Sequence, residues 1–337
     1  MKLLIIGDPH FKITNVRETD EMTDQIILSA KNITPNAIIV LGDILDRHET
    51  IHISPYIRSL NLLKELMEIA PTYVLIGNHD LKNNTEFLSN EHAFGPIKYW
   101  DSSKINIIDT TKEILIDNFK FVMVPYVPPG RFVEALNLCP EWMLADCIFA
   151  HQEFKGCKMG AITSVSGDNW PLDYPYVVSG HIHDYQTPQK NILYTGTPIQ
   201  HGFGDTKDKS ISLLTFTSGT KGFSEDRIYL NVRKKVIKYL TAQDLNNAKF
   251  DPTMDYKIVI KGSEQEIKAI KKYPIILSWQ QKGYKVTFKI NRIKQEKTSV
   301  PLKSDEYKNF LQILYEKIQD SPELKSVYIK VFSTNPI

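Results

Sequence analysis

The sequence predicts an α/β protein in which two β-sheets pack as a sandwich flanked by helices, followed by a small C-terminal α+β domain. Three observations predict this architecture. Short apolar strands alternate with amphipathic helices at the N-terminal end, many short strand candidates follow residue 100 with few helices between them, and strands and helices alternate again from residue 251. Each layer of such a protein buries an apolar face against the next.

The first 80 residues alternate strands and helices. Short runs rich in β-branched residues are typical of strands buried on both faces, and they are Lys2 to Ile6, Ala37 to Leu41 and Thr72 to Ile76. Between them, apolar residues at helical spacing predict helices over Glu18 to Ile33 and Ser54 to Ile69. This βαβαβ order predicts a parallel sheet.

The region after residue 100 consists mainly of strand candidates. They are Ile105 to Ile108, Glu113 to Ile116, Lys120 to Pro125, Cys147 to Ala150, Tyr176 to Ser179, Ile192 to Tyr194 and Ser210 to Phe216. Because few helices separate them, they favour a second sheet over a single doubly wound sheet.

The C-terminal part repeats the order strand, helix, strand, helix, strand. The elements expected are Tyr256 to Ile260, Glu264 to Lys272, Lys285 to Ile290, Ser304 to Ile318 and Val327 to Phe332. The Asn/Asp/Pro-rich stretch from Asp244 to Asp255 is typical of a connection between domains. We therefore predict a first domain of residues 1–235 and a second of residues 250–337.

Charge is divided unevenly along the 337 residues. Residues 231–337 hold 21 Lys+Arg and 11 Asp+Glu, a net charge of +10, whereas residues 1–230 hold 20 and 28, a net charge of −8. An acidic region can hold metal cations, and a basic one can bind a polyanion such as nucleic acid. A lysine-rich solvated surface is the alternative for the basic region.

Composition excludes several classes of protein. The three cysteines lack CxxC spacing and cannot all pair, which argues against a disulfide scaffold and a thiolate zinc finger. No apolar run reaches the length of a membrane span, and the start is too short for a signal peptide. We expect an intracellular protein of the cytoplasm or nucleoid, or of the infected-cell cytoplasm if the chain is viral.

Polar residues follow five of the strand candidates at the point where each strand ends. The five turns are Gly7-Asp8-Pro9-His10, Gly42-Asp43, Gly77-Asn78-His79-Asp80, His151 and Gly180-His181-Ile182-His183. Each alone is more typical of a turn or cap residue. Because ligands gather at the carboxyl ends of strands in open α/β sheets, we expect these side chains to converge on one edge.

These turns contain the residue types of a two-metal site. Seven candidate ligands offer imidazole, carboxylate and amide groups: Asp8, His10, Asp43, Asn78, His151, His181 and His183. They suffice for two ions if one carboxylate bridges both. We expect two divalent cations, with manganese favoured and iron, magnesium and zinc as alternatives.

Two ions about 3.5 to 4 Å apart lower the pKa of a shared water and neutralise phosphate oxygens. This chemistry predicts hydrolysis of a phosphate ester. His79 follows the candidate ligand Asn78 and is the expected proton donor to the leaving group, a role worth about 10²- to 10⁴-fold in rate.

The ordered motifs resemble those of the calcineurin-like metallophosphoesterase superfamily. D-x-H, G-D-x-x-D, G-N-H-D/E, H and G-H-x-H occur here as Asp8-Pro9-His10, Gly42-Asp43-Ile44-Leu45-Asp46, Gly77-Asn78-His79-Asp80, His151 and Gly180-His181-Ile182-His183. The resemblance implies one ion held by Asp8, His10, Asp43 and His183. It implies a second held by Asp43, Asn78, His151 and His181, with His79 assisting the leaving group.

The segment from Tyr194 to Asp205, with Gly196-Thr197-Pro198 and Phe203-Gly204-Asp205, is similar to a segment of the SbcD-type nucleases. These subunits process DNA ends with an SMC-like coiled-coil ATPase, and their DNA-capping domain matches the basic C-terminal domain in size and place. Many cellular members have a histidine where this chain has Asp46. Their linker and helical pair that dock on the ATPase are expected to be absent here, because the last strand candidate ends near Ile337.

We therefore predict a two-metal nuclease that hydrolyses DNA phosphodiester bonds at or near DNA ends, as an exonuclease or endonuclease in double-strand-break repair or recombination. A phosphatase or nucleotide phosphodiesterase of the same superfamily is one alternative, and a non-catalytic scaffold is another. DNA is the expected partner. An SMC-like ATPase subunit and a second copy of the chain are candidate protein partners, and no membrane is expected.

Several other residues have two readings. His48 and His52 follow the bridging candidate Asp43 and can reach a phosphate or lie on a surface loop, and His92 and His201 are expected to be structural. Trp170 and Tyr185 can stack on a base or pack under a loop. The long segment from Gln152 to Pro175 is expected to shape access to the site, since loops of that length tend to be functional.

Overall fold

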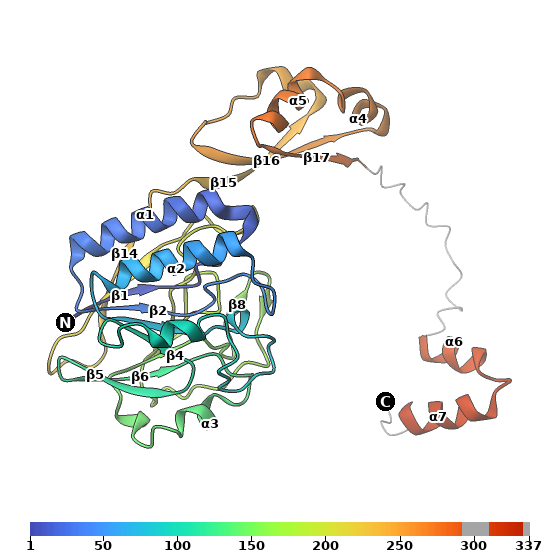
Figure 1. Ribbon diagram of the computed structural model, residues 1–337. Helices are drawn as coiled ribbons and strands as arrows, with labels where there is room; N and C mark the ends of the chain where they lie inside the picture. Colours follow the sequence, from blue (N-terminus) through green and yellow to red (C-terminus); the bar gives the residue numbers. More distant parts are fainter. Residues whose placement is uncertain (292–309, 333–337) are drawn as a thin grey trace. The chain divides into compact units, whose positions relative to one another are not determined.

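A computed structural model of the chain describes residues 1–291 and 310–332 (Figure 1). The chain divides into two compact units, Met1–Lys289 and Ile290–Ile337, which are described separately below. The prediction of an α/β protein with two packed sheets is confirmed. The division into domains of residues 1–235 and 250–337 stays a prediction.

The first sheet contains the predicted parallel strands. Its order is β14-β13-β1-β2-β3-β4, formed by β1 (Lys2–Ile6), β2 (Ala37–Val40), β3 (Thr72–Leu75), β4 (Ile105–Ile108), β13 (Ile211–Thr215) and β14 (Ser224–Ile228). Strands β1 to β4 pair in parallel, and β13 pairs antiparallel with β1 and β14. The carboxyl ends of β1, β2 and β3 therefore lie at one edge.

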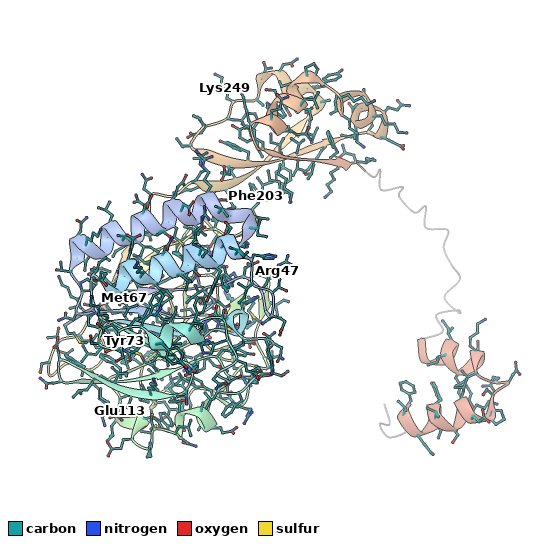
Figure 2. The ribbon with its side chains drawn as sticks, viewed as in Figure 1. Arg47, Met67, Tyr73, Glu113, Phe203 and Lys249 are labelled. Atoms are coloured by element: carbon teal, nitrogen blue, oxygen red, sulfur yellow. The ribbon has the colours of Figure 1, made fainter. Side chains whose placement is uncertain are left out.

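Helices α1 (Val16–Ile33) and α2 (Ile53–Met67) cover one face of this sheet (Figure 1). Strand β1 has apolar side chains on both faces of the sheet, because successive side chains of a strand point to opposite faces. Leu4 and Ile6 pack with the helices, whereas Leu3 and Ile5 face the second sheet. Side chains fill the space between the two sheets (Figure 2).

The second sheet has the order β11-β12-β10-β7-β6-β5. Its strands are β5 (Lys112–Ile116), β6 (Phe119–Val124), β7 (Cys147–Ala150), β10 (Val177–Ser179), β11 (Gln186–Gln189) and β12 (Ile192–Tyr194). The outer face packs against α3 (Phe132–Leu136) and a cluster that includes Phe154 and Trp170. Strands β6, β7, β10 and β12 pair in parallel, so β7 and β10 also end at one edge.

Shorter elements connect these strands. They are the 3₁₀ helices η1 (Ile13–Asn15), η2 (Asn78–Asp80), η3 (Gly95–Tyr99) and η4 (Trp142–Leu144), and the hairpin of β8 (Lys158–Met159) and β9 (Ile162–Thr163). The hairpin lies within the long loop that was expected to shape access to the site.

A third, three-stranded sheet follows residue 233. It consists of β15 (Lys234–Thr241), β16 (Met254–Gly262) and β17 (Lys285–Ile290), with η5 (Ala242–Asn247), α4 (Glu264–Ile270) and α5 (Pro274–Gln281). Strand β15 pairs in parallel with β16, so the Asn/Asp/Pro-rich stretch connects two paired strands. Tyr256, Ile258 and Ile260 of β16 face a core with Trp279 of α5.

The second unit contains helices α6 (Phe310–Lys317) and α7 (Pro322–Phe332). The predicted strand Val327 to Phe332 is wrong, because this segment is helical. Ser321 accepts a hydrogen bond from the Leu324 N–H (3.4 Å) and Pro322 occupies the first helical position, both features of a helix start. The predicted helix Ser304 to Ile318 begins outside the described residues.

The expectation that the chain lacks a helical pair is therefore also wrong. Leu324, Val327 and Val331 recur at helical spacing, and this period determines the conformation. None of the helices among residues 1–291 and 310–332 is long and apolar enough to cross a membrane.

Candidate active site

All five predicted turns meet at the edge where β1, β2, β3, β7 and β10 end. Six of the candidate ligands form two clusters, in each of which the ligand atoms lie within 4.8 Å of one another. The first cluster is Asp8, His10 and His183, and the second is Asp43, His151 and His181. The convergence expected from the sequence is thus confirmed for these side chains.

The Asp43 carboxylate belongs to the second cluster and also approaches the first. Its Oδ2 atom is 3.3 Å from Nε2 of His151 and 3.6 Å from Nε2 of His10. The side chain is almost fully buried, at 1% exposure. Burial raises the pKa of Asp43, but the neighbouring His151 and His10 hold this pKa well below the usual value. A carboxylate in this position can contact an ion in either cluster.

Asn78 joins the second cluster through its side-chain oxygen. Oδ1 lies 2.9 Å from Nδ1 of His181 and 3.1 Å from Nε2 of His151. Because Nδ1 of His151 donates to the Leu41 carbonyl (2.7 Å), its Nε2 faces the oxygens of Asn78 and Asp43. Burial lowers the pKa of His151, but Asp43 raises it to about 9. A proton or a metal ion is therefore favoured at this nitrogen.

The first cluster contains buried polar atoms without a hydrogen-bond partner among the described residues. They are Oδ2 of Asp8 and Nδ1 of His10. Burial raises the pKa of Asp8 to about 7, and Nε2 of His10 faces Nε2 of His183 at 3.0 Å. Burial lowers the pKa values of both histidines, so both rings are neutral and each can offer a nitrogen lone pair to a metal ion. These residues fit a divalent cation, which Oδ2 of Asp8 and one ring nitrogen of each histidine would hold.

Glycine is required at two of the turns because the backbone passes close to the carboxylates. A Cβ atom at Gly77 would lie 2.3 Å from Oδ1 of Asp43, and one at Gly180 would lie 2.5 Å from Oδ1 of Asp8. Asp43 and His181 themselves adopt left-handed φ angles of 46° and 77°. Such conformations cost free energy in non-glycine residues and cluster at functional sites.

Asp80 ties two of these turns together rather than joining a cluster. Its carboxylate accepts hydrogen bonds from the backbone N–H groups of Leu45 (3.0 Å), Gly77 (3.0 Å) and Ile44 (3.3 Å). Burial and the nearby Asp43 raise its pKa to about 7. The sequence motif contained Asp80, but only the structure shows that it fixes the loops after β2 and β3.

His79 lies beside the clusters and is held at three points. Its backbone N–H donates to Oδ1 of Asp43 (2.8 Å), and its Nδ1 donates to the Asp46 carbonyl (2.9 Å). Its ring stacks on that of His48, with centroids 4.9 Å apart and planes 10° apart. Because Nδ1 is occupied by a carbonyl, Nε2 is the nitrogen left for a leaving group.

His201 lies beside the first cluster, and its hydrogen bond to the backbone there agrees with the structural role that was expected. Its ring is 5.0 Å from that of His10 and 5.8 Å from that of His183, and its Nε2 donates to the Asp8 carbonyl (3.0 Å). The sequence signal for this position was that His201 lies in the segment from Tyr194 to Asp205, which resembles a segment of the SbcD-type nucleases. His92 is structural as expected, since its Nε2 contacts Asp109 (3.2 Å).

Tyr126 is a site residue that sequence reasoning missed. Its ring centroid lies 5.9 Å from that of His181 and 6.2 Å from that of His151, and its hydroxyl donates to the Asn84 carbonyl (3.1 Å). It therefore forms an apolar wall beside the second cluster. No local pattern marks it, because it follows a strand without a motif.

A cavity of about 370 Å³ opens beside both clusters. His181 and His183 line it together with Lys158 and Met159 of the hairpin. The segment from Gln152 to Pro175 thus borders the site, as predicted. Trp170 is only 5% exposed and packs among other aromatic rings, and the Arg227 guanidinium covers Tyr185 at 3.8 Å, so both have the packing role.

Comparisons with known proteins agree with this site. A model of the family described as "Calcineurin-like phosphoesterase" matches residues 1–185. The chain is 40% identical over 326 residues to "Putative phosphoesterase 078R" of Invertebrate iridescent virus 3, covering 95% of this chain and 92% of that protein. It is 43% identical over 281 residues to "Putative phosphoesterase 244L" of Invertebrate iridescent virus 6, covering 82% and 99%.

A solved structure, "The Crystal Structure of the Protein of Unknown Function AQ665 from Aquifex aeolicus", matches with a TM-score of 0.28 at 17% identity, over 46% of this chain and 82% of that one. The family match and the viral relatives agree with the geometry of the two clusters. Members of this family hydrolyse phosphoesters with divalent metal ions. The chain belongs to the calcineurin-like phosphoesterase family.

Proposed function

We propose that the chain is a two-metal nuclease that hydrolyses DNA phosphodiester bonds at or near DNA ends in repair or recombination. The observation that carries this proposal is the position of the Asp43 carboxylate, which contacts histidines of both clusters. The backbone N–H of His79 donates a hydrogen bond to the same carboxylate. One cluster would contain Asp8, His10, Asp43 and His183, and the other Asp43, Asn78, His151 and His181.

The bound ions would lower the pKa of a water and neutralise the phosphate oxygens. Manganese is the metal that we propose, because imidazole, carboxylate and amide ligands together suit it. Nε2 of His79 gives a proton to the leaving oxygen while the Asp46 carbonyl holds Nδ1 and fixes the ring. His48 stacks on this ring and limits its rotation.

The third sheet supports nucleic acid as the substrate. On β16 the residues Tyr256, Ile258 and Ile260 are buried, so Lys257 and Lys261 lie on the opposite, open face. Tyr239 of β15 is 58% exposed, and the Lys261 amine lies 4.4 Å from its ring centroid. Lysines interleaved with an exposed aromatic ring are typical of surfaces that contact phosphates and bases.

We further propose that α6 and α7 dock on an SMC-like coiled-coil ATPase subunit. Leu324, Val327 and Val331 of α7 are each more than half exposed and recur at spacings of three and four. Such a stripe is what a coiled-coil helix covers. Co-expression with an SMC-like ATPase of the same genome tests this, since Leu324→Glu with Val327→Glu is expected to abolish co-purification. Undiminished co-purification would contradict it.

The viral relatives lead us to propose the infected-cell cytoplasm as the place of action. The function itself is tested by incubating the protein and manganese with end-labelled duplex and single-stranded DNA, with bis-p-nitrophenyl phosphate and with a phosphomonoester. We expect shortened DNA strands and cleavage of the small diester. Hydrolysis of the monoester without DNA cleavage would instead indicate a phosphatase.

A further inference from the structure

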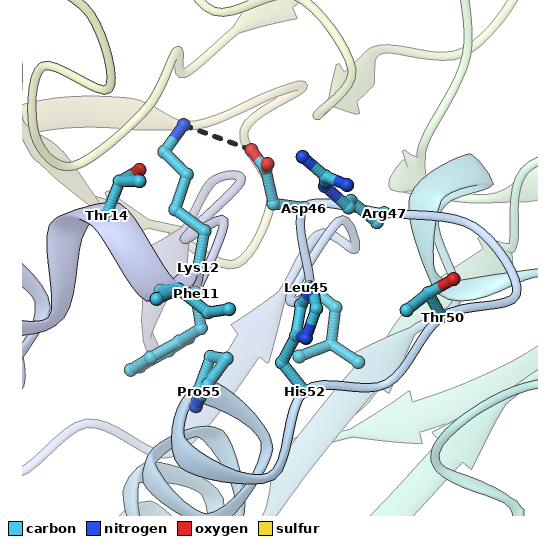
Figure 3. A pocket seen from close by; sticks show the side chains of 10 residues that line it. Phe11, Lys12, Thr14, Leu45, Asp46, Arg47, Thr50, His52 and Pro55 are labelled. Carbon is cyan, nitrogen blue, oxygen red and sulfur yellow. Dashed lines mark hydrogen bonds and ion pairs between the residues drawn. The ribbon is translucent and has the colours of Figure 1, made fainter.

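A second cavity, of about 180 Å³, has Asp46 in its lining (Figure 3). It is formed where the segment after β1 meets the segment between β2 and α2. Its polar lining consists of Lys12, Thr14, Asp46, Arg47, Thr50 and His52. The volume is about ten times the ~15 Å³ that one water needs, so a phosphate group fits with part of its hydration.

The charged groups around this cavity favour an anion. Nζ of Lys12 contacts Oδ1 of Asp46 at 3.1 Å, and this pair is close to neutral. Arg47 is exposed and has no ion-pair partner within residues 1–291 and 310–332. Its charge therefore remains uncompensated. Helix α2 begins beside the cavity, and its first turn contains no acidic residue that would repel an anion.

Asp46 connects this cavity to the reacting groups. Its carbonyl accepts the hydrogen bond from Nδ1 of His79 (2.9 Å), and its carboxylate lies 3.8 Å from Nδ1 of His10. Figure 3 shows Asp46 between Lys12 and Arg47. A group bound in the cavity would therefore be separated by Asp46 alone from the histidines that act on the scissile phosphate.

We propose that this cavity binds the phosphate next to the scissile one on a nucleic acid strand, with the Arg47 guanidinium as its main contact. A planar guanidinium forms two parallel hydrogen bonds with phosphate oxygens, and the hydroxyls of Thr14 and Thr50 supply further donors. The inference rests on the proposed nuclease function. It assigns the substrate class, because phosphomonoesters and small diesters have no neighbouring phosphate.

The test combines a change in the protein with a change in the substrate. Trinucleotides are prepared with a neutral methylphosphonate on either side of the remaining diester, and kcat/KM is measured with manganese for the parent and for Arg47→Ala. For the parent we expect one of the two modified trinucleotides to be cleaved about tenfold more slowly than the unmodified one. Arg47→Ala should cleave the unmodified trinucleotide equally slowly and lose nothing further on modification.

The matched control is Lys64→Ala, an exposed lysine in the last turn of helix α2, whose first turn borders the cavity. It should respond to the methylphosphonate as the parent does. An equal response of the parent and Arg47→Ala to the modification, or no response in the parent, would overturn the inference and leave the nuclease function intact. Cleavage of bis-p-nitrophenyl phosphate without cleavage of any trinucleotide would overturn both.

Discussion

The metal-ligand edge of the sandwich and the open face of the third sheet both gather charge, but in opposite environments. At the edge, Asp8 and Asp43 are 0% and 1% exposed, and a nitrogen of His151 lies within 3.6 Å of each carboxylate. On β16, Lys257 and Lys261 are partly exposed, with no ion-pair partner in the described part of the chain.

The difference in burial between the two regions determines how much free energy their charges cost. Taking an uncompensated charge out of water costs several kcal/mol, so a cation bound among buried carboxylates and imidazoles would stabilise the cluster. Exposed lysines cost little and remain free to contact phosphates. The buried edge can therefore carry the reaction chemistry, whereas the exposed face can contribute only to association.

Removing the shared carboxylate is expected to have the largest effect. Asp43→Ala should reduce bound manganese and lower cleavage of DNA and of the small diester to background, because both clusters lose a ligand. Metal content by elemental analysis and initial rates measure this. Retention of both ions per chain would contradict the bridging role.

Removing the proton donor separates chemistry from metal binding at the same edge. His79→Ala should keep the metal content of the parent and lower manganese-dependent cleavage at least about a hundredfold. The loss should shrink for a leaving group that needs no proton, such as p-nitrophenolate. Unchanged turnover on DNA would remove His79 from the mechanism.

Removing the lysine charges from the open face of the third sheet should weaken DNA binding without changing the metal centre. Lys257→Gln with Lys261→Gln should flatten the slope of log affinity for DNA against log salt by about 0.9 for each lost phosphate contact. Hydrolysis of the small diester serves as the measure of the metal centre. Lys272→Gln with Lys282→Gln, two exposed lysines outside the strands of the third sheet, is the matched control. An unchanged slope would favour a solvated surface.

Removing the charge of Asp109, a buried carboxylate that already pairs with His92 and Lys98, should have the smallest effect, and this effect is on stability. Burial raises the pKa of Asp109, but His92 and Lys98 lower it to about 2. Because the folded-state pKa lies below the unfolded value, the stabilisation is present above about pH 4 and lost as the pH falls through 2. Asp109→Asn should cost about 1 kcal/mol at pH 7, allowing for solvent screening.

Urea unfolding of the parent and Asp109→Asn at pH 7 and at pH 3 measures this cost. The difference between them should narrow at the lower pH. A difference that is constant with pH would mean that Asp109 acts through packing rather than charge.

The ligand edge could be predicted because its signals are local. Each candidate ligand follows a strand of recognisable pattern, and parallel strands end at the same side of a sheet. His201 and Tyr126 could not be placed in this way, since neither follows a strand with a metal-ligand motif. Their proximity to His10 and His181 depends on contacts between distant segments.

The C-terminal end shows the opposite case. The run from Val327 to Phe332 has β-branched residues that favour a strand and a spacing that favours a helix. The structure forms a helix that begins at Pro322. Likewise, the sequence did not predict strand β15, because this strand is stabilised by pairing along its length with β16.

By itself, the sequence determined where most of the sandwich strands lie along the chain and which polar residues follow them, because side-chain periodicity and turn chemistry depend on a few neighbouring residues. Only the tertiary structure decided which side chains share an ion site, that Asp80 fixes two turns, that His201 lies beside His10, and that a cationic cavity adjoins Asp46. These features depend on distances between strands and loops far apart in the chain, and burial there alters the charge of each group in ways that no local pattern encodes.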